Sequence, residues 1–215
     1  DVYKRQIPHE VDYSRIDIGA SGEFVHTKLV AAEDCDKKLV GRIVETYQRL
    51  APGLRAVCFM SSVKKAEETA AEFRQAGIAS VAVDGNTDIE LRAKVMEDLA
   101  SGKIMVLVNV GVVGEGTDIP DVEVVILGTR TASFVLYAQW WGRGSRLVLD
   151  AAAREGYDQL TAAERRARIA ASAKPFYRII DHGGNVIQHN GPPDLRQAPW
   201  TVSYTHLTLP TTPYV

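Results

Sequence analysis

The sequence predicts an α/β fold in which a parallel sheet carries helices on both faces. Short runs of apolar residues alternate along the chain with longer segments whose apolar residues recur every three or four positions. The short runs show no alternation of apolar and polar residues, which indicates strands buried on both faces, as in parallel sheets. The length of 215 residues, 46% of them hydrophobic, is enough for one domain with a substantial core.

The strands are expected where short apolar stretches occur without the length of a helix. Glycine, proline or polar turn residues bound most of these stretches, as they bound buried strands in general. In chain order, the expected strands cover residues 55–60, 78–83, 104–109, 122–127 and 176–180.

The helices are expected beside these strands, and several have signals at their ends. Pro52 would end the first and Gly77 the second, since glycine readily adopts the left-handed conformation that follows many helices. Asp88 would lie in the first turn of the third, near the positive end of its dipole. Thr161 and Glu164 have the spacing of a capping box for the last. The expected helices cover residues 36–50, 63–76, 88–100, 132–141 and 161–173.

The two ends of the chain have weaker patterns. Residues 7–32 are mixed and are expected to form a loop with at most one strand. Near the other end, Gly183-Gly184-Asn185 before an apolar pair predicts a hairpin. Residues 1–6 and about 202–215 resemble translated sequencing-adapter read-through, so we expect non-native tails on a chain truncated by assembly. An ordinary disordered tail would give the same structural expectation.

Composition and charge narrow the classes of function. The formal net charge of −2 does not predict nucleic-acid binding by electrostatics alone, although a local patch can still bind a backbone. Cys35 and Cys58 are too far apart for a C-x-x-C pair, and no histidine cluster accompanies them, so we expect no metal site. No run approaches the roughly 20 apolar residues of a membrane span, and no signal peptide is visible. We therefore expect a cytoplasmic protein without a membrane partner.

Polar residues and glycines follow the expected strands at the edge where ligands bind in parallel sheets. Ser61 and Ser62 follow the first strand, Gly85 follows the second, and Asn109 ends the third. Ligands of such sheets bind beyond the carboxyl ends of the strands, and glycine lets a backbone approach a phosphate closely. Ser62 has an alternative role as the cap of the helix that begins at Val63, and capping and phosphate contact can coexist.

The segment from Gln139 to Arg146 has the pattern Q-x-x-G-R-x-x-R at the end of an apolar helical run. A guanidinium keeps its charge and offers a fork of donors that matches phosphate oxygens. Alone, Arg143 and Arg146 would be ordinary solvated arginines near a helix end. Trp140 and Trp141 lie about 100° apart on this helix, so we expect one in the core and the other at the surface or a domain contact, rather than a base-stacking pair.

These segments, taken in order, resemble motifs IV, V and VI of the superfamily-two helicases. Residues 56–62 resemble motif IV, residues 104–126 resemble motif V, and residues 139–146 resemble motif VI. Between them, residues 83–85 followed by Arg92 resemble another segment of the same lobe. The match covers about residues 54–149 and is closest to the DEAD/DEAH-like helicases, including an Asp-His-Gly-Gly-Asn segment at 181–185. Ordered co-occurrence is a stronger signal than any single motif.

The resemblance implies a domain organisation. Residues 7–53 would be a leading segment and helix, and residues 54–190 would be a RecA-like helicase C-terminal domain with a helical insertion at about 147–175. Residues 191–215 would be a tail. The glycines at 111, 114 and 116 do not have the spacing of a dinucleotide fingerprint, and Pro120 blocks the helix that should follow one.

The resemblance also implies roles for site residues. Arg143 and Arg146 would face the phosphates of ATP across a cleft between two lobes, with Arg146 as the arginine finger. Gln139 would orient them or touch the nucleotide, and Gly116 and Asp118 would couple the nucleotide to the nucleic acid. DNA or RNA would be held through its backbone by Ser61, Ser62, Gly85, Asn109 and Thr117. Where many helicases have Thr-Asp after the motif V strand, this chain has Val110-Gly111, which removes one expected hydroxyl.

The sequence contains neither a P-loop nor an acidic Mg²⁺ site. We therefore expect a second lobe whose ATP with Mg²⁺ is held mainly by an N-terminal RecA-like lobe outside this sequence, and we expect these residues alone to be inactive. The alternative is a non-catalytic module that binds nucleic acid or a partner without hydrolysis.

Overall fold

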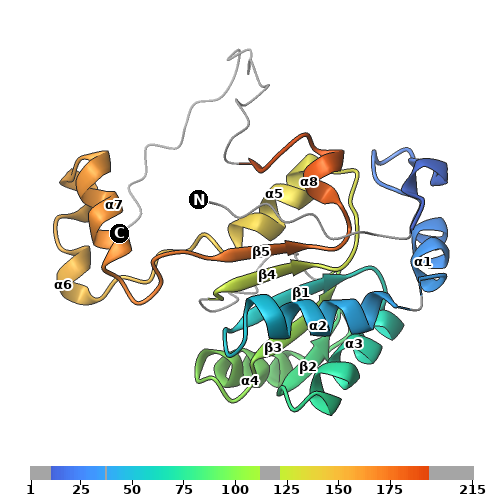
Figure 1. The fold of residues 1–215 in the computed structure, drawn as a ribbon, viewed down its shortest axis with the longest axis horizontal. Coiled ribbons are helices and arrows are strands. Elements are labelled where there is room, and N and C mark those ends of the chain that lie inside the picture. The colour runs from blue at the N-terminus through green and yellow to red at the C-terminus, as the bar shows by residue number, and fades with distance from the viewer. Residues whose placement is uncertain (1–10, 37, 112–121, 194–215) are drawn as a thin grey trace.

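The computed structural model describes residues 11–36, 38–111 and 122–193, and the described residues form a five-stranded parallel sheet. The strand order is β2-β3-β1-β4-β5, with β1 in the centre (Figure 1). The predicted fold class, a parallel sheet with helices on both faces, is confirmed. The strands are β1 (Ala56–Met60), β2 (Ser80–Val83), β3 (Val106–Val110), β4 (Val124–Leu127) and β5 (Arg178–Asp181).

Helices cover both faces and both ends of this sheet (Figure 1). On one face, α2 (Leu39–Leu50) and α3 (Val63–Gln75) pack on the strands, and on the other α4 (Ile89–Ala100) and α5 (Phe134–Gly142) do. The remaining helical elements are η1 (Tyr13–Arg15), α1 (His26–Asp34), α6 (Ala151–Arg154), η2 (Tyr157–Gln159), α7 (Ala162–Ala170) and α8 (Asn185–Gln188).

Strand β1 shows how the two faces are filled. All five of its residues are buried, and successive side chains point to opposite faces because a strand has a period of two. Ala56, Cys58 and Met60 lie in the core under α2 and α3, whereas Val57 and Phe59 lie in the core under α4 and α5. A run without alternation is therefore the sequence signature of this central strand, as expected for a parallel sheet.

Several helix ends follow the predicted chemistry. The Ser62 hydroxyl accepts a hydrogen bond from the Lys65 amide at 3.3 Å, so Ser62 caps α3. Asp88 caps α4, and Thr161 and Glu164 form the predicted capping box on α7. Gly77 follows α3 with φ of 78°. These side chains and glycines set the element boundaries because they satisfy backbone groups that a helix end leaves without partners.

Two predictions about the ends of the domain are wrong. The segment expected as loop with at most one strand contains the helix α1, which no side chain of the described residues caps and which buries only Leu29 and Glu33. The expected hairpin is instead the short helix α8. There the Asp181 carboxylate accepts the Val186 amide at 2.8 Å, which starts a helical turn where a hairpin strand would need an extended backbone.

The expectation that one of the two tryptophans is exposed is also wrong. Trp140 and Trp141 are 6% and 5% exposed. Trp140 stacks on Phe59 with ring centroids 5.2 Å apart, while Trp141 meets the Tyr137 ring edge to face at 5.7 Å. The two tryptophan side chains can both be buried, although they lie 100° apart on α5, because this core extends beyond the face of the sheet. Ile179 of β5 and Val186 of α8 also pack against it.

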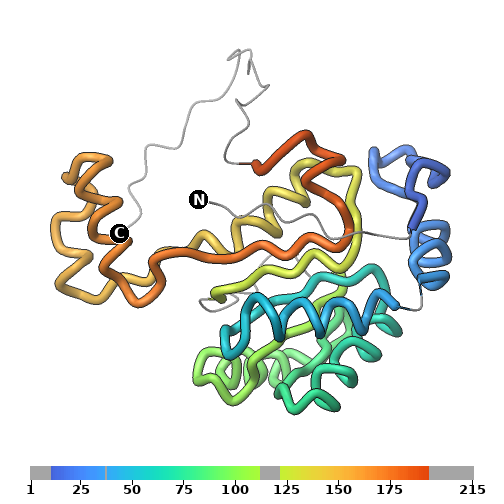
Figure 2. Tube along the Cα trace, viewed as in Figure 1, coloured from blue at the N-terminus to red at the C-terminus, as the bar shows by residue number. Residues whose placement is uncertain are grey.

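Figure 2 shows the course of the chain from the leading segment, at one end of the sheet, to the insertion at the other. Within residues 11–36, 38–111 and 122–193, none of the helices combines the length and the hydrophobicity needed to cross a bilayer. The predicted tails at 1–6 and 202–215, and the predicted site residues Gly116, Thr117 and Asp118, lie outside the described residues.

Candidate nucleotide and nucleic-acid sites

The predicted site residues lie at opposite ends of the sheet. Strands β4 and β5 are parallel neighbours, with Arg178 beside Val124, so the chain must return to the amino end of the sheet before β5 begins. Helix α5 makes this return, and it delivers Arg143 and Arg146 to the amino end. Ser61, Gly85 and Asn109 lie at or after the carboxyl ends of their strands. In Figure 1, α1 and α7 mark these two ends of the molecule.

At the carboxyl end, the hydroxyls that follow β1 already have partners within the chain. Ser61 is 7% exposed and donates to the carboxylate of Glu33, and its carbonyl oxygen lies 2.8 Å from His26 Nε2. Ser62 is half-buried and caps α3. The Ser61 hydroxyl could reach a phosphate only if Glu33 moved away.

Glu33 is a buried carboxylate that sequence reasoning missed. It is fully buried and accepts hydrogen bonds from Ser61, from Thr129 Oγ1 at 2.7 Å and from the Tyr13 hydroxyl at 3.2 Å. Burial raises the pKa of Glu33, and the hydrogen bonds from Ser61, Thr129 and Tyr13 oppose that shift. Its partners come from the ends of β1 and β4, so Glu33 joins α1 to both strands. No local sequence pattern marks a glutamate in an irregular segment as buried.

Glu23 fixes the same leading segment at a second point. Its carboxylate accepts the Ala132 amide at 2.6 Å, the Ser133 amide at 3.2 Å and the Thr131 hydroxyl. These residues open α5, so the leading segment holds the start of the helix that carries the arginines. An apolar cluster supports the contact, made of Val11, Tyr13, Ile16, Phe24 and Leu29.

Two further predicted nucleic-acid contacts, Gly85 and Asn109, lie at the carboxyl ends of β2 and β3. Gly85 is exposed, and the Arg92 guanidinium organises its turn by donating to the carbonyls of Asp84 and Thr87, both at 3.1 Å. Asn109 is 3% exposed, and its Nδ2 has no hydrogen-bond partner among the described residues. Arg92 therefore acts here on the backbone of the turn.

The arginine motif continues directly from α5. The amides of Arg143, Gly144 and Ser145 donate to carbonyls three residues earlier, at 3.2, 3.1 and 3.2 Å, so the chain tightens into a turn after the helix. Gln139 and Arg143 are four residues apart and share one face of the helix. Gln139 and Arg146 are exposed and Arg143 is half-buried, whereas Trp140 and Trp141 anchor the other sides.

The Asp-His-Gly-Gly-Asn segment at 181–185 braces the connection between β4 and α5. Asn185 is fully buried; its Nδ2 donates to the Thr129 carbonyl at 2.8 Å and its Oδ1 accepts the Thr131 amide at 3.0 Å. Arg130 Nε donates to the Gly183 carbonyl at 2.5 Å. These contacts of Gly183 and Asn185 form a brace that fixes the start of α5, in addition to the contacts from Glu23. The sequence did not indicate this role.

His182 in this segment is buried without polar partners. It is 2% exposed, and neither ring nitrogen has a hydrogen-bond partner among the described residues. Burial, with the nearby Arg42 guanidinium, lowers the pKa of His182 to about 4, and Asp36 opposes the shift. Arg42 is itself paired with Asp36. His182 is thus a neutral core residue at neutral pH.

Within the described parts of the chain, no three histidine, cysteine, aspartate or glutamate side chains lie together in a way that could hold a metal ion. The chemistry that these residues offer is a pair of guanidiniums at one end of the sheet and hydrogen-bonding groups at the other. Paired guanidiniums on a parallel α/β domain suit the binding of a phosphate-bearing ligand.

Comparison with known proteins places the chain in a family. The family model described as "Helicase conserved C-terminal domain" matches residues 38–148, just over half of the 215 residues. The chain belongs to this helicase C-terminal domain family. The match contains β1 to β4, α5 and the arginine motif, and it ends just before α6.

Individual relatives agree with this family. A "51.5 kDa protein" of a Lactococcus phage (isolate 7-9) is 35% identical over 149 residues, which are 66% of this chain and 32% of that protein. The pre-mRNA-splicing ATP-dependent RNA helicase prp28 of Aspergillus terreus is 30% identical over 136 residues, 61% of this chain and 17% of that protein. The chain thus spans about a third and about a sixth of these two relatives.

Among solved structures, the E. coli DEAD-box protein SrmB, bound to regulator of ribonuclease activity A, is similar to 67% of this chain and over 82% of its own. The sequence identity is 20% and the TM-score is 0.47. The family membership rests on the sequence match to the family.

Proposed function

We propose that this chain is the C-terminal lobe of an ATP-dependent nucleic-acid helicase or translocase, in which Arg143 and Arg146 act on the phosphates of ATP. The observation that carries the proposal is the placement of these arginines. They extend from a helix whose other sides are anchored by two buried tryptophans, at the end of the sheet away from Ser61 and Asn109. Membership of the helicase C-terminal domain family supports a role in a helicase.

The residues present fit part of an ATP site. Guanidiniums on a rigid helix end suit a polyphosphate, and Gln139 lies on the same face as Arg143. The sequence has no P-loop lysine or Mg²⁺ ligands, so the first lobe would hold most of the nucleotide and its metal. ATP supplies the phosphoryl group whose transfer to water releases the energy for movement. The arginines of this chain would neutralise negative charge on the phosphates, and Gln139 would orient them. Gly116 and Asp118, which lie outside the described residues, would couple the nucleic-acid contacts to the nucleotide.

Nucleic acid would bind at the carboxyl end, through Gly85 and Asn109 on the β2 and β3 side and through the backbone around Ser62. Thr117, which lies outside the described residues, would add a hydroxyl contact. Asn109 Nδ2 supports this side, because it is a buried donor with no partner among the described residues. Ser61 would contribute its hydroxyl only after release from Glu33. DNA and RNA share the phosphate backbone that these groups would contact.

Turnover by this chain alone tests the proposal most simply. Residues 1–215 alone are expected to hydrolyse no ATP above background, whereas a protein that carries both lobes should show ATPase stimulated by single strands. Purified 1–215 that hydrolyses ATP, and loses this activity in Arg146→Ala, would overturn the assignment as one lobe of two.

A further inference from the structure

We propose that Lys174 and Tyr177, in the stem that leads from the helical insertion into β5, are positioning residues for the loop that carries Arg143 and Arg146. The proposal rests on the function proposed above for Arg146. It assigns a role in the ATPase reaction to residues that lie beyond the family match at 38–148.

Lys174 contacts the arginine loop through its backbone. Its ammonium group donates to the carbonyl oxygen of Arg146 at 3.0 Å, although the two residues are 28 positions apart. Lys174 is only 8% exposed, which is unusual for lysine, because burial of an ammonium is costly unless it is hydrogen-bonded. A charge-assisted bond to a main-chain carbonyl fixes the backbone from which the Arg146 side chain extends.

Tyr177 contacts the same loop at Gly144. A Cβ atom added to Gly144 would lie 2.5 Å from Tyr177 Cδ2 and 3.1 Å from Cε2 and Cγ, so the ring lies against the glycine. Gly144 does not have a positive φ, and the ring is therefore the reason that a side chain does not fit. Gly144 stands between the two arginines, and the stem thus contacts the loop at two points.

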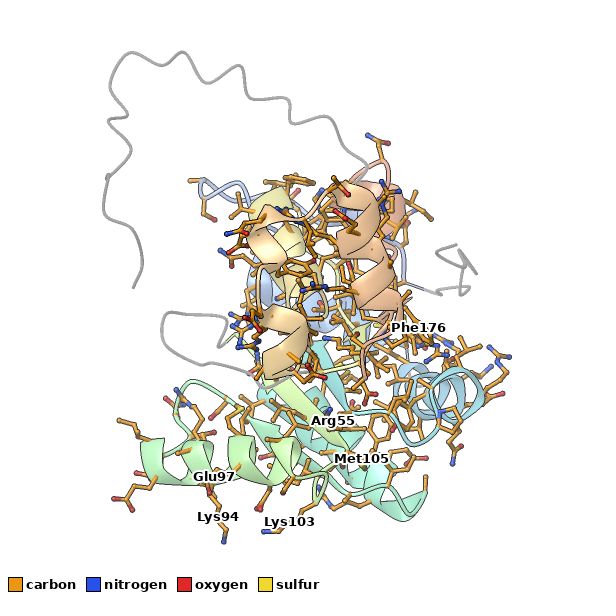
Figure 3. The ribbon with its side chains drawn as sticks, turned by 90° about the vertical axis from the view of Figure 1, so that its left-hand side faces the viewer. Arg55, Lys94, Glu97, Lys103, Met105 and Phe176 are labelled. Atoms are coloured by element: carbon orange, nitrogen blue, oxygen red, sulfur yellow. The ribbon has the colours of Figure 1, made fainter. Side chains whose placement is uncertain are left out.

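The remainder of the insertion is largely exposed and makes hydrogen bonds within itself. None of the residues of α6, η2 and α7, all within the described part of the chain, is buried. Arg165 and Arg168 donate instead to carbonyls inside the insertion, to Tyr157 and Asp158 and to Ala153 and Glu155. The stem therefore provides contacts to the arginine loop, at Lys174 and Tyr177. Figure 3 shows the molecule from this end, with Phe176 of the stem labelled.

Positioning matters because an arginine finger acts only when its guanidinium meets the phosphate. A displacement of about 1 Å in a catalytic group can cost on the order of a hundredfold in rate. Without the Lys174 bond, the Arg146 backbone would sample more conformations, and the transition-state contact would form in only part of them. Substrate binding, which depends mainly on the other lobe, should change little.

The test compares Lys174→Met, Lys174→Arg and Lys103→Met in the protein that carries both lobes. Lys103 is a matched control, since it lies at the same end of the sheet with a side chain that is 75% exposed. Lys174→Met should lower kcat of the strand-stimulated ATPase about tenfold, with KM for ATP and strand affinity within about twofold. Lys174→Arg should recover most of the loss, and Lys103→Met should match wild type.

Amide hydrogen exchange in residues 1–215 gives a readout without activity. Peptides that cover residues 143–149 should exchange about tenfold faster in Lys174→Met and at the wild-type rate in Lys103→Met. Unchanged exchange and unchanged kcat in Lys174→Met would overturn the proposal. If Arg146→Lys leaves ATPase intact, the proposed function itself fails; if Arg146→Lys is slow and Lys174→Met is normal, only the positioning role fails.

A double-mutant cycle decides the matter if Lys174→Met does not fold. Gly144→Ala should lower kcat about tenfold, because its methyl group would push on the Tyr177 ring. Tyr177→Ala should also lower kcat, because Tyr177 positions the loop, and the double variant should lose clearly less than the two single losses combined, since removing the ring makes room for the methyl group. Losses that combine additively would contradict a contact between stem and loop.

Discussion

The two ends of the sheet use their polar residues in opposite ways. At the carboxyl end, the Ser61 and Thr129 hydroxyls are hydrogen-bonded to the buried Glu33. At the amino end, Gln139 and Arg146 keep exposed side chains, while the contacts from Lys174 and Tyr177 fall on the backbone of their loop. The hydrogen-bond partners of a polar side chain in a motif therefore help to indicate its role. The hydroxyls at the carboxyl end of β1 and β4 are held by Glu33, whereas the side chains of Gln139 and Arg146 at the amino end are exposed.

The largest expected effect concerns the brace at the carboxyl end. Gly183→Ala should destabilise the domain by about 3 kcal/mol or more, because a Cβ there would lie 2.5 Å from the Thr129 carbonyl carbon, a backbone atom with no room to move. Urea denaturation of residues 1–215 measures this change. Gly41→Ala is the control, since nothing lies within 4 Å of its Cβ position in α2, and it should be neutral or stabilising. Equal stability of the two variants would show that the contact between Gly183 and Thr129 leaves room for a methyl group.

The next effect is a pH dependence of folding stability, which arises from His182 at the same end of the sheet. The pKa of His182 falls from 6.5 to about 4 on folding, so the unfolded chain binds more protons than the native state between these values. Stability from this group is therefore present above pH 6.5 and is lost as the pH falls toward 4, by about 3 kcal/mol in total. His182→Gln, which does not titrate, should remove this part of the slope in denaturation series from pH 7 to 4. A variant with the wild-type slope would mean that His182 is not buried as a neutral ring.

A second pH effect, of opposite sign, is expected from Glu33. Its pKa is raised in the folded state, so the native state binds more protons, and its contribution to stability is lost as the pH rises above 4.5. The glutamine in Glu33→Gln stays neutral at every pH. The free energy of unfolding of this variant, relative to wild type, should therefore increase with pH, by less than about 1.4 kcal/mol per pH unit. The same pH series measures it, with Glu97→Gln on the exposed side of α4 as control. A decrease relative to wild type would show that the carboxylate is better stabilised than its burial suggests.

The sequence predicted the sheet, the main helices and their caps because these depend on local patterns. Apolar runs such as residues 56–60 and end signals such as Ser62 and Thr161 act within a few residues. Helix α1 and the brace could not be predicted, since Glu33 finds its partners 20 to 96 positions away in the chain and Asn185 bonds Thr131 and Thr129 at 54 and 56 positions. The ordered motifs indicated which residues are candidates for ligand binding. Whether Ser61 is exposed depends on a segment with no motif at all.

The central claim is that the arginine end acts on the nucleotide and the carboxyl end on the nucleic acid. Arg146→Lys in the protein that carries both lobes tests it most directly, because lysine keeps the charge and loses the planar fork. We expect strand-stimulated ATPase to fall at least about tenfold, which corresponds to the loss of about 1.4 kcal/mol of transition-state stabilisation. Single-strand affinity without nucleotide should stay within about twofold of wild type. If ATPase survives while strand binding collapses, Arg146 contacts the nucleic-acid backbone and the assignment of the two ends is wrong.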